Sequence, residues 1–544
     1  MTNFTTRKTF LVPSFDLDVK ERDKLDRFLL LLDNSGVKKF FQIKKPYELE
    51  KGGRPSYNPY DMFATILYGF AFNSSTLREL ETACKYDLRY FYLMQQERPS
   101  HIRFGEFIND VIVPNGNEIF SMVTGQIIKE CGLKIEDVFI DGSKFEADAN
   151  KYKFVWKPTK FHLKLSDKVR KLLNDIGMSR GVPNTGFIDS KLIGQKLSTL
   201  SNDERHIKEY NLLYDYLIKT LEYEEKERIC GDRNSYYKTD HDATAMTLKS
   251  DYYSGLGSNM KAAYNTQLLV SNGIICSYYI SQSRSDISDF IPVLKRFNDF
   301  YGYYPKRVCA DAGYGSLENY RFLNDNNIEN YVKYFTFDGN VSGRNPDQYH
   351  FNDNDTITCL NNLTGYKVNI PYRHPKKAEA VFYKIDGCNN NCEFKDFCKR
   401  WMKNKNVDYK IFEVVEELQR YKNQSFENLL SVKGIEMRVN RSSQVEGAFG
   451  VLKEDMNYTR LRRTSLHKVI AEFMLTFLGY NIRKLFRYYD GKAKFTYWKA
   501  PDNLLPETKK KPSAKRLSNK VKKKKKKPVN QISKDSYKNK RKRS

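Results

Sequence analysis

Short apolar runs separated by turn signals occupy the first part of the chain. DKLDRFLLLLD and DMFATILYGFAF are two such runs, and GGRPSYNP between them is typical of a turn. Runs of this length with helical spacing predict amphipathic helices. The pattern therefore predicts an all-helical N-terminal domain over residues 1–130.

One part of this region has the spacing of a helix-turn-helix. SSTLRELETACKYDLRYFYLM is followed by PSHIRFGEFIND, and Ser74 or Ser75 is placed to cap the first helix. The same periodicity is typical of ordinary core packing, so both interpretations stay open.

The pattern changes at residue 138 to short β-type runs. Val138–Ile140 form an apolar run that ends at Asp141, and Arg307–Ala310 form another that ends at Asp311. Between them, AAYNTQLLVS and GIICSYYISQS are joined at Asn272-Gly273, a strong β-hairpin signal. A helical run, SDISDFIPVLKRFNDF, follows the hairpin. Two acids are therefore expected at the ends of two buried strands.

Two segments interrupt this series of strands. Residues 151–235 are charged, and their apolar positions keep a heptad spacing for about two repeats, which predicts a helical hairpin. Residues 336–430 separate the last of these strands from the final helical stretch, and they contain a group of cysteines. The interrupted core is thus expected at residues 131–150 and 236–335, with its C-terminal helices at residues 431–490.

The last helical stretch of the core is GIEMRVNRSSQVEGAFGVLKEDM. Glu446 lies at the edge of its apolar stripe, and Lys453, seven positions later, falls on nearly the same face. Gly450 between them is expected to let another backbone come close.

Charge narrows the class of partner. The 544 residues carry a formal charge of +27, which favours a polyanion because each neutralised phosphate releases a counterion. Residues 509–544 hold 18 Lys and Arg against one acid, and we expect residues 491–544 to be a disordered basic tail. Lys522, Lys523 and Lys524 are its expected DNA contacts. A merely solubilising tail is the alternative.

No segment predicts export or membrane insertion. MTNFTTRKTFLVPSF lacks the apolar run of a signal peptide, and AEFMLTFLGY is about half as long as a membrane span. We expect a cytoplasmic protein that associates with the nucleoid.

The order strand, acid, hairpin, helix, strand, acid, and later a helix with Glu is that of a ribonuclease H-like α/β domain. The segments VFIDGSKFEADANK, KAAYNTQ, VCADAGYGSLENY and QVEGAFGVLK resemble those of bacterial insertion-sequence transposases of the DDE class, and most closely the insertion-sequence 1182 family. The resemblance is spread over most of residues 20–487. It implies a ribonuclease H-like catalytic domain with two insertions, preceded by an all-helical DNA-binding domain.

The resemblance also implies a site and partners. Asp141, Asp311 and Glu446 match the catalytic triad, which holds two Mg²⁺ or Mn²⁺ ions, and Arg441 and Lys453 match basic positions around the glutamate. Arg441 lies five residues before Glu446, whereas four is usual. The implied partners are double-stranded DNA, as terminal inverted repeats and as target, and further copies of the chain in a homodimer or higher oligomer. A stand-alone nuclease and a catalytically silent, domesticated DNA-binding protein are the alternatives.

The chemistry needs these residue types. In-line attack on a phosphodiester uses one ion to activate the nucleophile and another to stabilise the leaving oxygen. Mg²⁺ prefers oxygen ligands, so three carboxylates are a suitable set. Tyr314 and Asn319 follow Asp311 closely enough to be candidate DNA contacts.

Two further groups of polar residues have two interpretations each. Cys359, Cys388, Cys392 and Cys398 either bind one structural Zn²⁺ or are reduced, unliganded thiols. Asp240 and Asp242 are either neighbours of the site or, as we favour, turn-forming residues.

Overall fold

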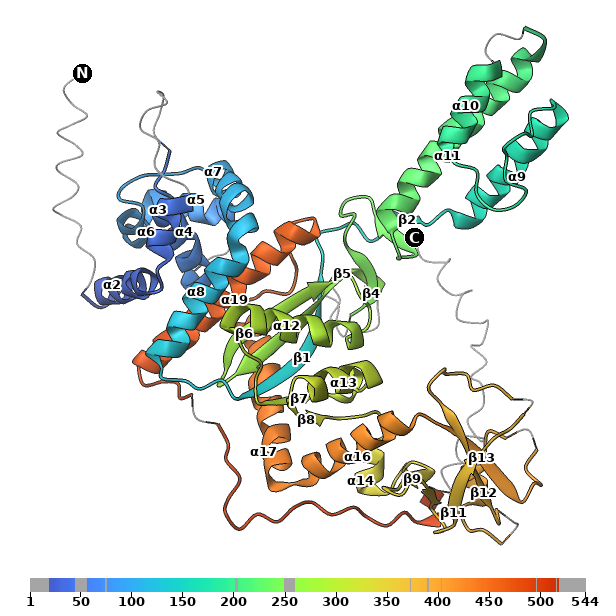
Figure 1. The fold of residues 1–544 in the computed structure, drawn as a ribbon. Helices are drawn as coiled ribbons and strands as arrows, with labels where there is room; N and C mark the ends of the chain where they lie inside the picture. Colours follow the sequence, from blue (N-terminus) through green and yellow to red (C-terminus); the bar gives the residue numbers. More distant parts are fainter. Residues whose placement is uncertain are drawn as a thin grey trace, which may run out of the picture. The chain divides into compact units, whose positions relative to one another are not determined.

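The computed structural model describes residues 19–44, 56–73, 76–200, 204–248, 260–371, 373–388, 391–402, 404–495, 497–514 and 516–517. The protein is a mixed α/β chain that divides into two compact units (Figure 1). Unit 1 comprises Met1–Ile135, Ile140–Tyr304 and Ser443–Tyr497, and unit 2 comprises Glu136–Phe139, Pro305–Ser442 and Trp498–Ser544. Strand β1 (Asp137–Glu146) contributes residues to both.

Unit 1 begins with helices, and no strand occurs among the described residues before β1. The elements are α2 (Val19–Asn34), α3 (Val37–Lys44), α4 (Pro59–Tyr68), the π-helical turn η1 (Gly69–Asn73), α5 (Leu77–Tyr86), α6 (Leu88–Leu93), α7 (His101–Phe107), the π-helical turn η2 (Ile108–Ile112) and α8 (Val113–Glu130). Helix α4 is buried on nearly all sides, so it forms the centre of this group.

The cap of α5 differs from the one expected. Thr76 is the N-cap, and it forms a reciprocal capping box with Glu79. The prediction of Ser74 or Ser75 as the cap is wrong in that respect, and those two serines lie outside the described residues. The sequence T-x-x-E carried the correct signal.

The sheet of unit 1 consists of antiparallel strands around β5. Its strands are β1, β4 (Thr244–Thr247), β5 (Met260–Ser271) and β6 (Ile274–Ser281). Their order is β4-β5-β1, and β6 also pairs with β5. Asn272 and Gly273 both have positive φ, as the tight turn of the expected hairpin requires.

Two helices cover the two faces of this sheet. The short 3-10 turn η4 (Ile287–Asp289) leads into α12 (Phe290–Tyr301), whose Val293 carbonyl accepts a hydrogen bond from Ser277 Oγ. On the other face, the Tyr278 ring packs on Phe477 of α19 (Leu466–Tyr489). Because both faces are covered, β5 is buried along almost its whole length.

Helix α19 also packs against the N-terminal helices. A Cβ added at Gly479 would lie 2.8 Å from the Phe70 carbonyl oxygen, so only glycine permits this close approach. Asn481 Oδ1 accepts from the Ile275 amide, and Asn481 Nδ2 donates to the Ile275 carbonyl, both at 2.9 Å. Before α19 come the π-helical turn η6 (Ser442–Glu446), α18 (Gly447–Gly450) and the π-helical turn η7 (Val451–Asp455).

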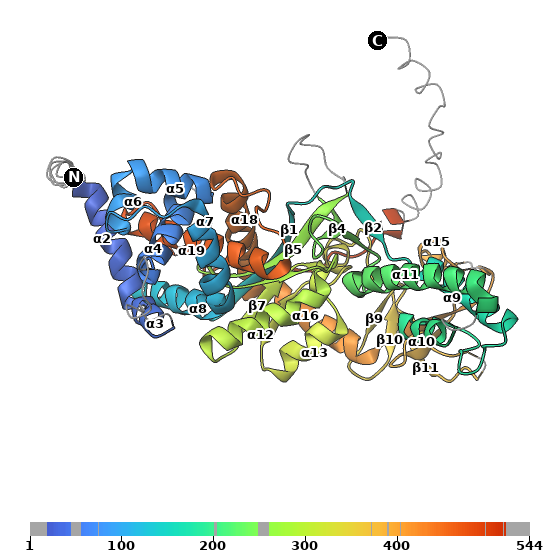
Figure 2. The same cartoon turned by 90° about the horizontal axis from the view of Figure 1, so that it is seen from above.

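Residues 151–235 form a helical subdomain of unit 1 with its own core. It contains β2 (Phe154–Trp156), α9 (Thr159–Asp175), α10 (Ser190–Leu200), the 3-10 turn η3 (Glu204–His206) and α11 (Ile207–Cys230), and β3 (Ser235–Tyr237) follows. The three helices lie side by side in both views (Figures 1 and 2). Val169, Leu173, Ile193 and Leu213 are among the residues buried between them. Strands β2 and β3 pair antiparallel at the two ends of this segment.

Unit 2 contains two sheets. Its elements are β7 (Arg307–Ala310), the 3-10 turn η5 (Ala312–Tyr314), α13 (Leu317–Asp325), β8 (Glu329–Val332), α14 (Phe337–Ser342), β9 (Tyr349–Phe351), β10 (Ile357–Cys359), β11 (Thr364–Val368), β12 (Val381–Asp386), α15 (Lys395–Cys398), β13 (Tyr409–Val414), α16 (Glu416–Leu430) and α17 (Val432–Arg441). Strands β7 and β8 are parallel, and the Arg307 amide donates to the Glu136 carbonyl just before β1. Strands β9 to β13 form an antiparallel sheet in sequential order, which the sequence did not predict.

The chain after residue 490, which we predicted to be disordered, is in part packed against the rest of the protein. The amides of Ala500, Glu507 and Lys510 donate to Glu436, Leu430 and Val341, all within unit 2. Leu517 is buried with Phe394 and Phe397. The prediction of disorder from residue 491 onwards is therefore wrong for the described residues up to Leu517, because these backbone bonds and apolar contacts hold them. Lys522, Lys523 and Lys524 lie outside the described residues.

A buried ion pair between β1 and β5 gives a test of this fold. Lys261 Nζ lies 3.1 Å from Glu146 Oε2, and both side chains are buried. Lys261→Met leaves the carboxylate buried and unpaired, which should lower the free energy of unfolding by about 3–5 kcal/mol. Urea unfolding of the full chain, followed by circular dichroism, measures this change in the free energy of unfolding.

Arg103→Met is the matched control, because the Arg103–Glu106 pair is exposed on the same unit and contributes little. The double variant Glu146→Gln/Lys261→Met should be more stable than Lys261→Met alone, since the unpaired charge is gone. Equal midpoints for Lys261→Met and Arg103→Met would contradict the assigned role of the pair.

Candidate functional site

Asp141 lies on the face of β1 that meets the segment η6–η7 within unit 1. Side chains alternate along a strand, so Asp141 shares its face with Ser143 and Phe145. Lys453 Nζ donates to Ser143 Oγ at 2.6 Å and lies 4.8 Å from the centroid of the Phe145 ring. The Phe145 ring also packs on Phe449. Asp141 is half-buried, and its own Oδ1 accepts from the Gly142 amide.

Glu446 is an exposed residue one turn before Phe449 on this segment. It is the last residue of the π-helical turn η6, and η7 begins at Val451. Such π turns change the helical register locally and are frequent at functional sites. The contacts of this segment with β1 are made by Phe449 and Lys453, which follow Glu446 in sequence. The expected close approach at Gly450 is absent, because nothing lies within 4 Å of a Cβ added there.

A polar cluster lies on the opposite face of β1, behind Gly142. A Cβ at Gly142 would lie 2.6 Å from the Gln267 amide and 3.0 Å from Asp286 Oδ1. Asp286 Oδ1 accepts from Asn265 Nδ2 at 2.8 Å and from Gln267 Nε2 at 3.0 Å. Burial raises the pKa of Asp289, the next acid along the chain, to about 6. These side chains fix the strand beside Asp141.

Sequence reasoning assigned no role to this cluster. Asp286 lies at the start of the predicted helical run SDISDFIPVLKRFNDF. Its side chain makes no cap bond and instead accepts hydrogen bonds from the side-chain amides of Asn265 and Gln267 in β5. The polar letters N-T-Q within an otherwise apolar strand, at Asn265 and Gln267, were the available signal.

Asp311 belongs to unit 2, where it directly follows β7 and is exposed. Burial raises the pKa of the neighbouring Cys309 thiol to about 12, while Arg441 opposes this shift and Asp311 adds to it. Both charged groups are therefore within electrostatic reach of the end of β7. The positive charges of Arg438 and Lys333 also lower the pKa of this thiol.

Tyr314 and Asn319 do not have the exposure that a DNA contact needs. Each is only 2% exposed, and Asn319 Nδ2 donates to the Tyr314 carbonyl at 2.8 Å. The interpretation of both as DNA contacts is not supported by this burial, and the Asn319 side chain instead holds the turn after Asp311 together. We leave both out of the proposed DNA-binding surface.

Asp240 and Asp242 have structural partners. Asp240 is buried and accepts hydrogen bonds from the Tyr264 hydroxyl and from the Ser465 amide. Asp242 Oδ2 accepts from the Leu466 amide, and its own amide donates to Asp240 Oδ1 as in an Asx turn. Together they tie this turn to the start of α19.

The four cysteines of the second insertion line one small cavity in unit 2. Cys359, Cys388, Cys392 and Cys398 share it with the buried Lys399 and Lys410, and its volume is about 20 Å³. Lys399 Nζ donates to the Cys388 carbonyl at 2.5 Å, and Lys410 Nζ donates to the Cys398 carbonyl. Among the described residues, no carboxylate forms an ion pair with either lysine.

The described carboxylates and thiols do not form a complete metal-binding site. In the described part of the chain, no three Cys, His, Asp or Glu side chains are grouped so that they hold a metal ion. The donor types nevertheless suit different metals, since carboxylate oxygens match Mg²⁺ and thiolates match Zn²⁺.

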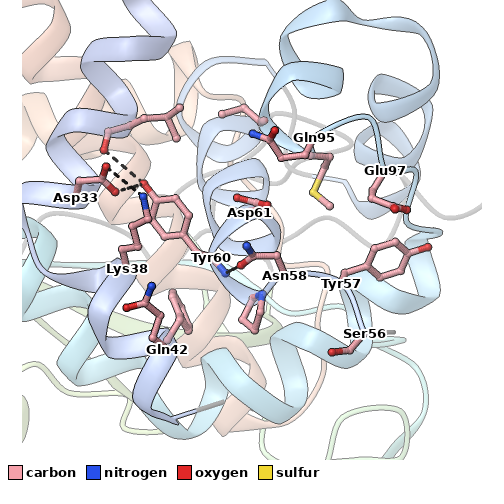
Figure 3. Close-up of a pocket in the computed structure, with 15 residues that line it drawn as sticks. Asp33, Lys38, Gln42, Ser56, Tyr57, Asn58, Tyr60, Asp61, Gln95 and Glu97 are labelled. Atoms are coloured by element: carbon pink, nitrogen blue, oxygen red, sulfur yellow. Dashed lines mark hydrogen bonds and ion pairs between the residues drawn. The ribbon is translucent and has the colours of Figure 1, made fainter. Parts of the chain in front are cut away.

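A cavity larger than the cysteine cavity lies among the N-terminal helices. It has a volume of about 820 Å³ and is lined by Asp33, Lys38, Tyr60 and Asp61, among others (Figure 3). The Tyr60 hydroxyl donates to Asp33 Oδ1 at 2.7 Å, and burial raises the pKa of Asp61 to about 6. None of the expected catalytic residues lines it, so its size does not mark the site.

Two family models match parts of the chain. A family model described as "Transposase DDE domain" matches residues 358–486, which include Glu446 and Lys453, and "Transposase domain (DUF772)" matches residues 13–110. The matches support a DDE transposase. No curated protein and no solved structure matches the chain. Among the described helices, none has the length and apolar composition that crossing a membrane requires.

The contact behind Gly142 yields a prediction. Gly142→Ala places a methyl group against the fully buried Gln267 side chain, so unfolding should become easier by about 1–3 kcal/mol. Gly450→Ala is the control, because its surroundings are open and helical alanine gains up to about 1 kcal/mol over glycine. Thermal melting of the two variants compares them, and a Gly142→Ala protein as stable as Gly450→Ala would refute the packing argument.

Proposed function

We propose that the protein is a transposase that binds the ends of its own insertion sequence and catalyses metal-dependent DNA strand cleavage and strand transfer. The observation that carries this proposal is the transposase DDE match over residues 358–486, which contains the segment η6–η7 that packs on β1 beside Asp141. The insertion-sequence 1182 family remains the one that the sequence most resembles.

A ribonuclease H-like catalytic domain is part of the proposal. Each unit supplies support of its own: the order β4-β5-β1 with the hairpin β5–β6 in unit 1, and the parallel pair β7–β8 in unit 2. Asp311 directly follows β7, as the sequence predicted. Asp141 lies within β1, which continues to Glu146 past the predicted strand end.

Asp141, Asp311 and Glu446 are the proposed ligands of two Mg²⁺ or Mn²⁺ ions. When bound, such ions activate the attacking oxygen and stabilise the leaving oxygen of the phosphodiester. Lys453 is held at β1 by Ser143 and would offer its positive charge to a DNA phosphate. Arg441 has the same proposed role at the end of β7.

The proposed partners are double-stranded DNA, as terminal inverted repeats and as target, and further copies of the chain in a homodimer or higher oligomer. The basic residues after Leu517, including Lys522, Lys523 and Lys524, would bind phosphates without reading sequence. A cytoplasmic, nucleoid-associated location follows from this partner. A stand-alone nuclease would cleave the same DNA without joining strands.

Carboxylate variants test the catalytic assignment. Asp141→Asn, Asp311→Asn and Glu446→Gln each remove a metal ligand but no phosphate contact, so each should reduce Mg²⁺-dependent nicking of a terminal-repeat duplex by at least about 10³-fold. Binding of the same duplex, measured by gel shift, should stay within about twofold of wild type.

Glu318→Gln is the control, since this exposed acid of α13 lies close to Asp311 in sequence and has no proposed role. Any one of the three variants that nicks at the wild-type rate is misassigned. A strand-joining assay with a pre-cleaved end separates the transposase from the nuclease, and the silent alternative predicts no cleavage by the wild type.

We also propose that the cysteine cavity in unit 2 holds one structural Zn²⁺. Its volume admits a single ion or water, and four thiolates around Zn²⁺ carry a net charge of −2. The ammonium groups of Lys399 and Lys410 supply +2, and these buried charges otherwise have only neutral acceptors. The site would join two small apolar clusters, around Tyr383 and around Phe397.

Elemental analysis of the full chain, purified without chelators, should find one zinc per chain. Lys410→Met should weaken zinc retention against a chelator by about 10- to 100-fold, because it removes a neighbouring charge and not a ligand. Lys384→Met is the control on the exposed side of the same sheet. Less than a tenth of an equivalent of zinc would refute the site, and equal retention in both lysine variants would refute the charge balance.

A further inference from the structure

An exposed row of aromatic side chains runs along the start of the helical subdomain of unit 1. Four aromatic residues of the segment 151–161 are exposed: Tyr152 by 78%, Phe154 by 44%, Trp156 by 64% and Phe161 by 65%. Phe154 and Trp156 point to the same side of β2, while Val155 between them is less exposed. Large apolar side chains gathered in this way mark an interaction surface more often than chance exposure does.

Lysines alternate with these aromatic residues. Lys151, Lys153, Lys157 and Lys160 belong to the same segment, which contains no acidic residue. Lys151, Lys153 and Lys160 are exposed, and Lys151 Nζ lies 5.0 Å from the centroid of the Tyr152 ring. A partner must therefore offer both flat apolar faces and negative charge. Lysine is depleted at the centres of protein–protein interfaces, which disfavours a protein partner.

The surface is held in place by its own sheet. Strand β2 pairs with β3, with Phe154 opposite Tyr237 and Trp156 opposite Ser235. The Phe154 ring meets the Trp156 ring edge-on, with centroids 5.5 Å apart. Lys157 Nζ donates to the Gly231 carbonyl, just after α11, and the buried Tyr237 ring lies beside Phe154, with centroids 6.5 Å apart. Rings that are already ordered lose little conformational entropy when a ligand stacks on them.

We propose that this row, Tyr152, Phe154, Trp156 and Phe161 with their interleaved lysines, binds unpaired DNA bases by stacking. The lysines would contact the phosphates that connect the bases. Bases within a duplex are stacked on one another and do not offer their faces, so the surface selects single-stranded or unpaired DNA. The inference rests on the proposed function only in taking DNA as the substrate, since cleavage and joining produce strand ends whose bases unpair.

Binding of a fluorescently labelled oligo-dT of about 15 nucleotides to the full chain tests the proposal. Trp156→Ala and Phe154→Ala should each weaken this binding by about tenfold, because one stacked base is lost, and Trp156→Phe should retain most of it. Binding of a blunt duplex should change by less than about twofold. Lys151→Gln and Lys153→Gln should each reduce the slope of log affinity against log salt by about 0.7.

Trp401→Ala is the matched control, because Trp401 is 80% exposed and lies in unit 2, outside the row. If Trp156→Ala binds oligo-dT as tightly as Trp401→Ala does, the proposal is overturned. It is also overturned if Trp156→Ala leaves DNA binding unchanged but shifts the oligomeric state, since the row is then a protein interface. Neither outcome depends on the catalytic carboxylates. If the proposed function itself is wrong, the Asp141, Asp311 and Glu446 variants nick DNA at the wild-type rate.

Discussion

Two hydrogen bonds between the buried Asn481 side chain of α19 and the backbone of Ile275 in β6 organise unit 1. The β5–β6 ladder shifts register between Leu269 and Val270, and beyond the shift Ile275 has its amide and carbonyl bound by the Asn481 side chain. Buried backbone groups must be paired, and a carboxamide offers one donor and one acceptor at the required spacing. These two hydrogen bonds fix the position of α19 against the sheet.

The environment of Asp141 follows from that position. With α19 in place, Phe473 packs on Phe145, and the preceding segment η6–η7 is brought against the same face of β1. The opposite face of β1 is held by Gln267 and Asp286 against a glycine. A short carboxylate on a strand supported from both sides has little freedom, which is what metal-dependent phosphodiester chemistry demands of its ligands.

Charge is used differently in the two units. In unit 1 the buried Lys261 has a carboxylate partner, whereas in unit 2 the buried Lys399 and Lys410 face thiols and carbonyls. The aromatic row of residues 151–161 is a third arrangement, in which Lys151, Lys153 and Lys160 are exposed to solvent beside exposed aromatic rings. The first arrangement stabilises a fold, and the other two call for a ligand, because each leaves charge or apolar surface uncompensated.

The sequence by itself determined the local elements that arise from short-range patterns. It predicted the strand that ends directly before Asp311, the hairpin at Asn272-Gly273 and the helices on either side, because periodicity and turn chemistry act over a few residues. The predicted end of the first strand at Asp141 is wrong, since β1 continues to Glu146. Only the tertiary structure decided the Asp286 cluster, the burial of Tyr314 and Asn319, the contacts of residues 497–514 and 516–517, and the sheet β9–β13. Each of these features depends on partners that are distant in sequence. A local pattern of residues does not predict which distant backbone or side chain will pack against it.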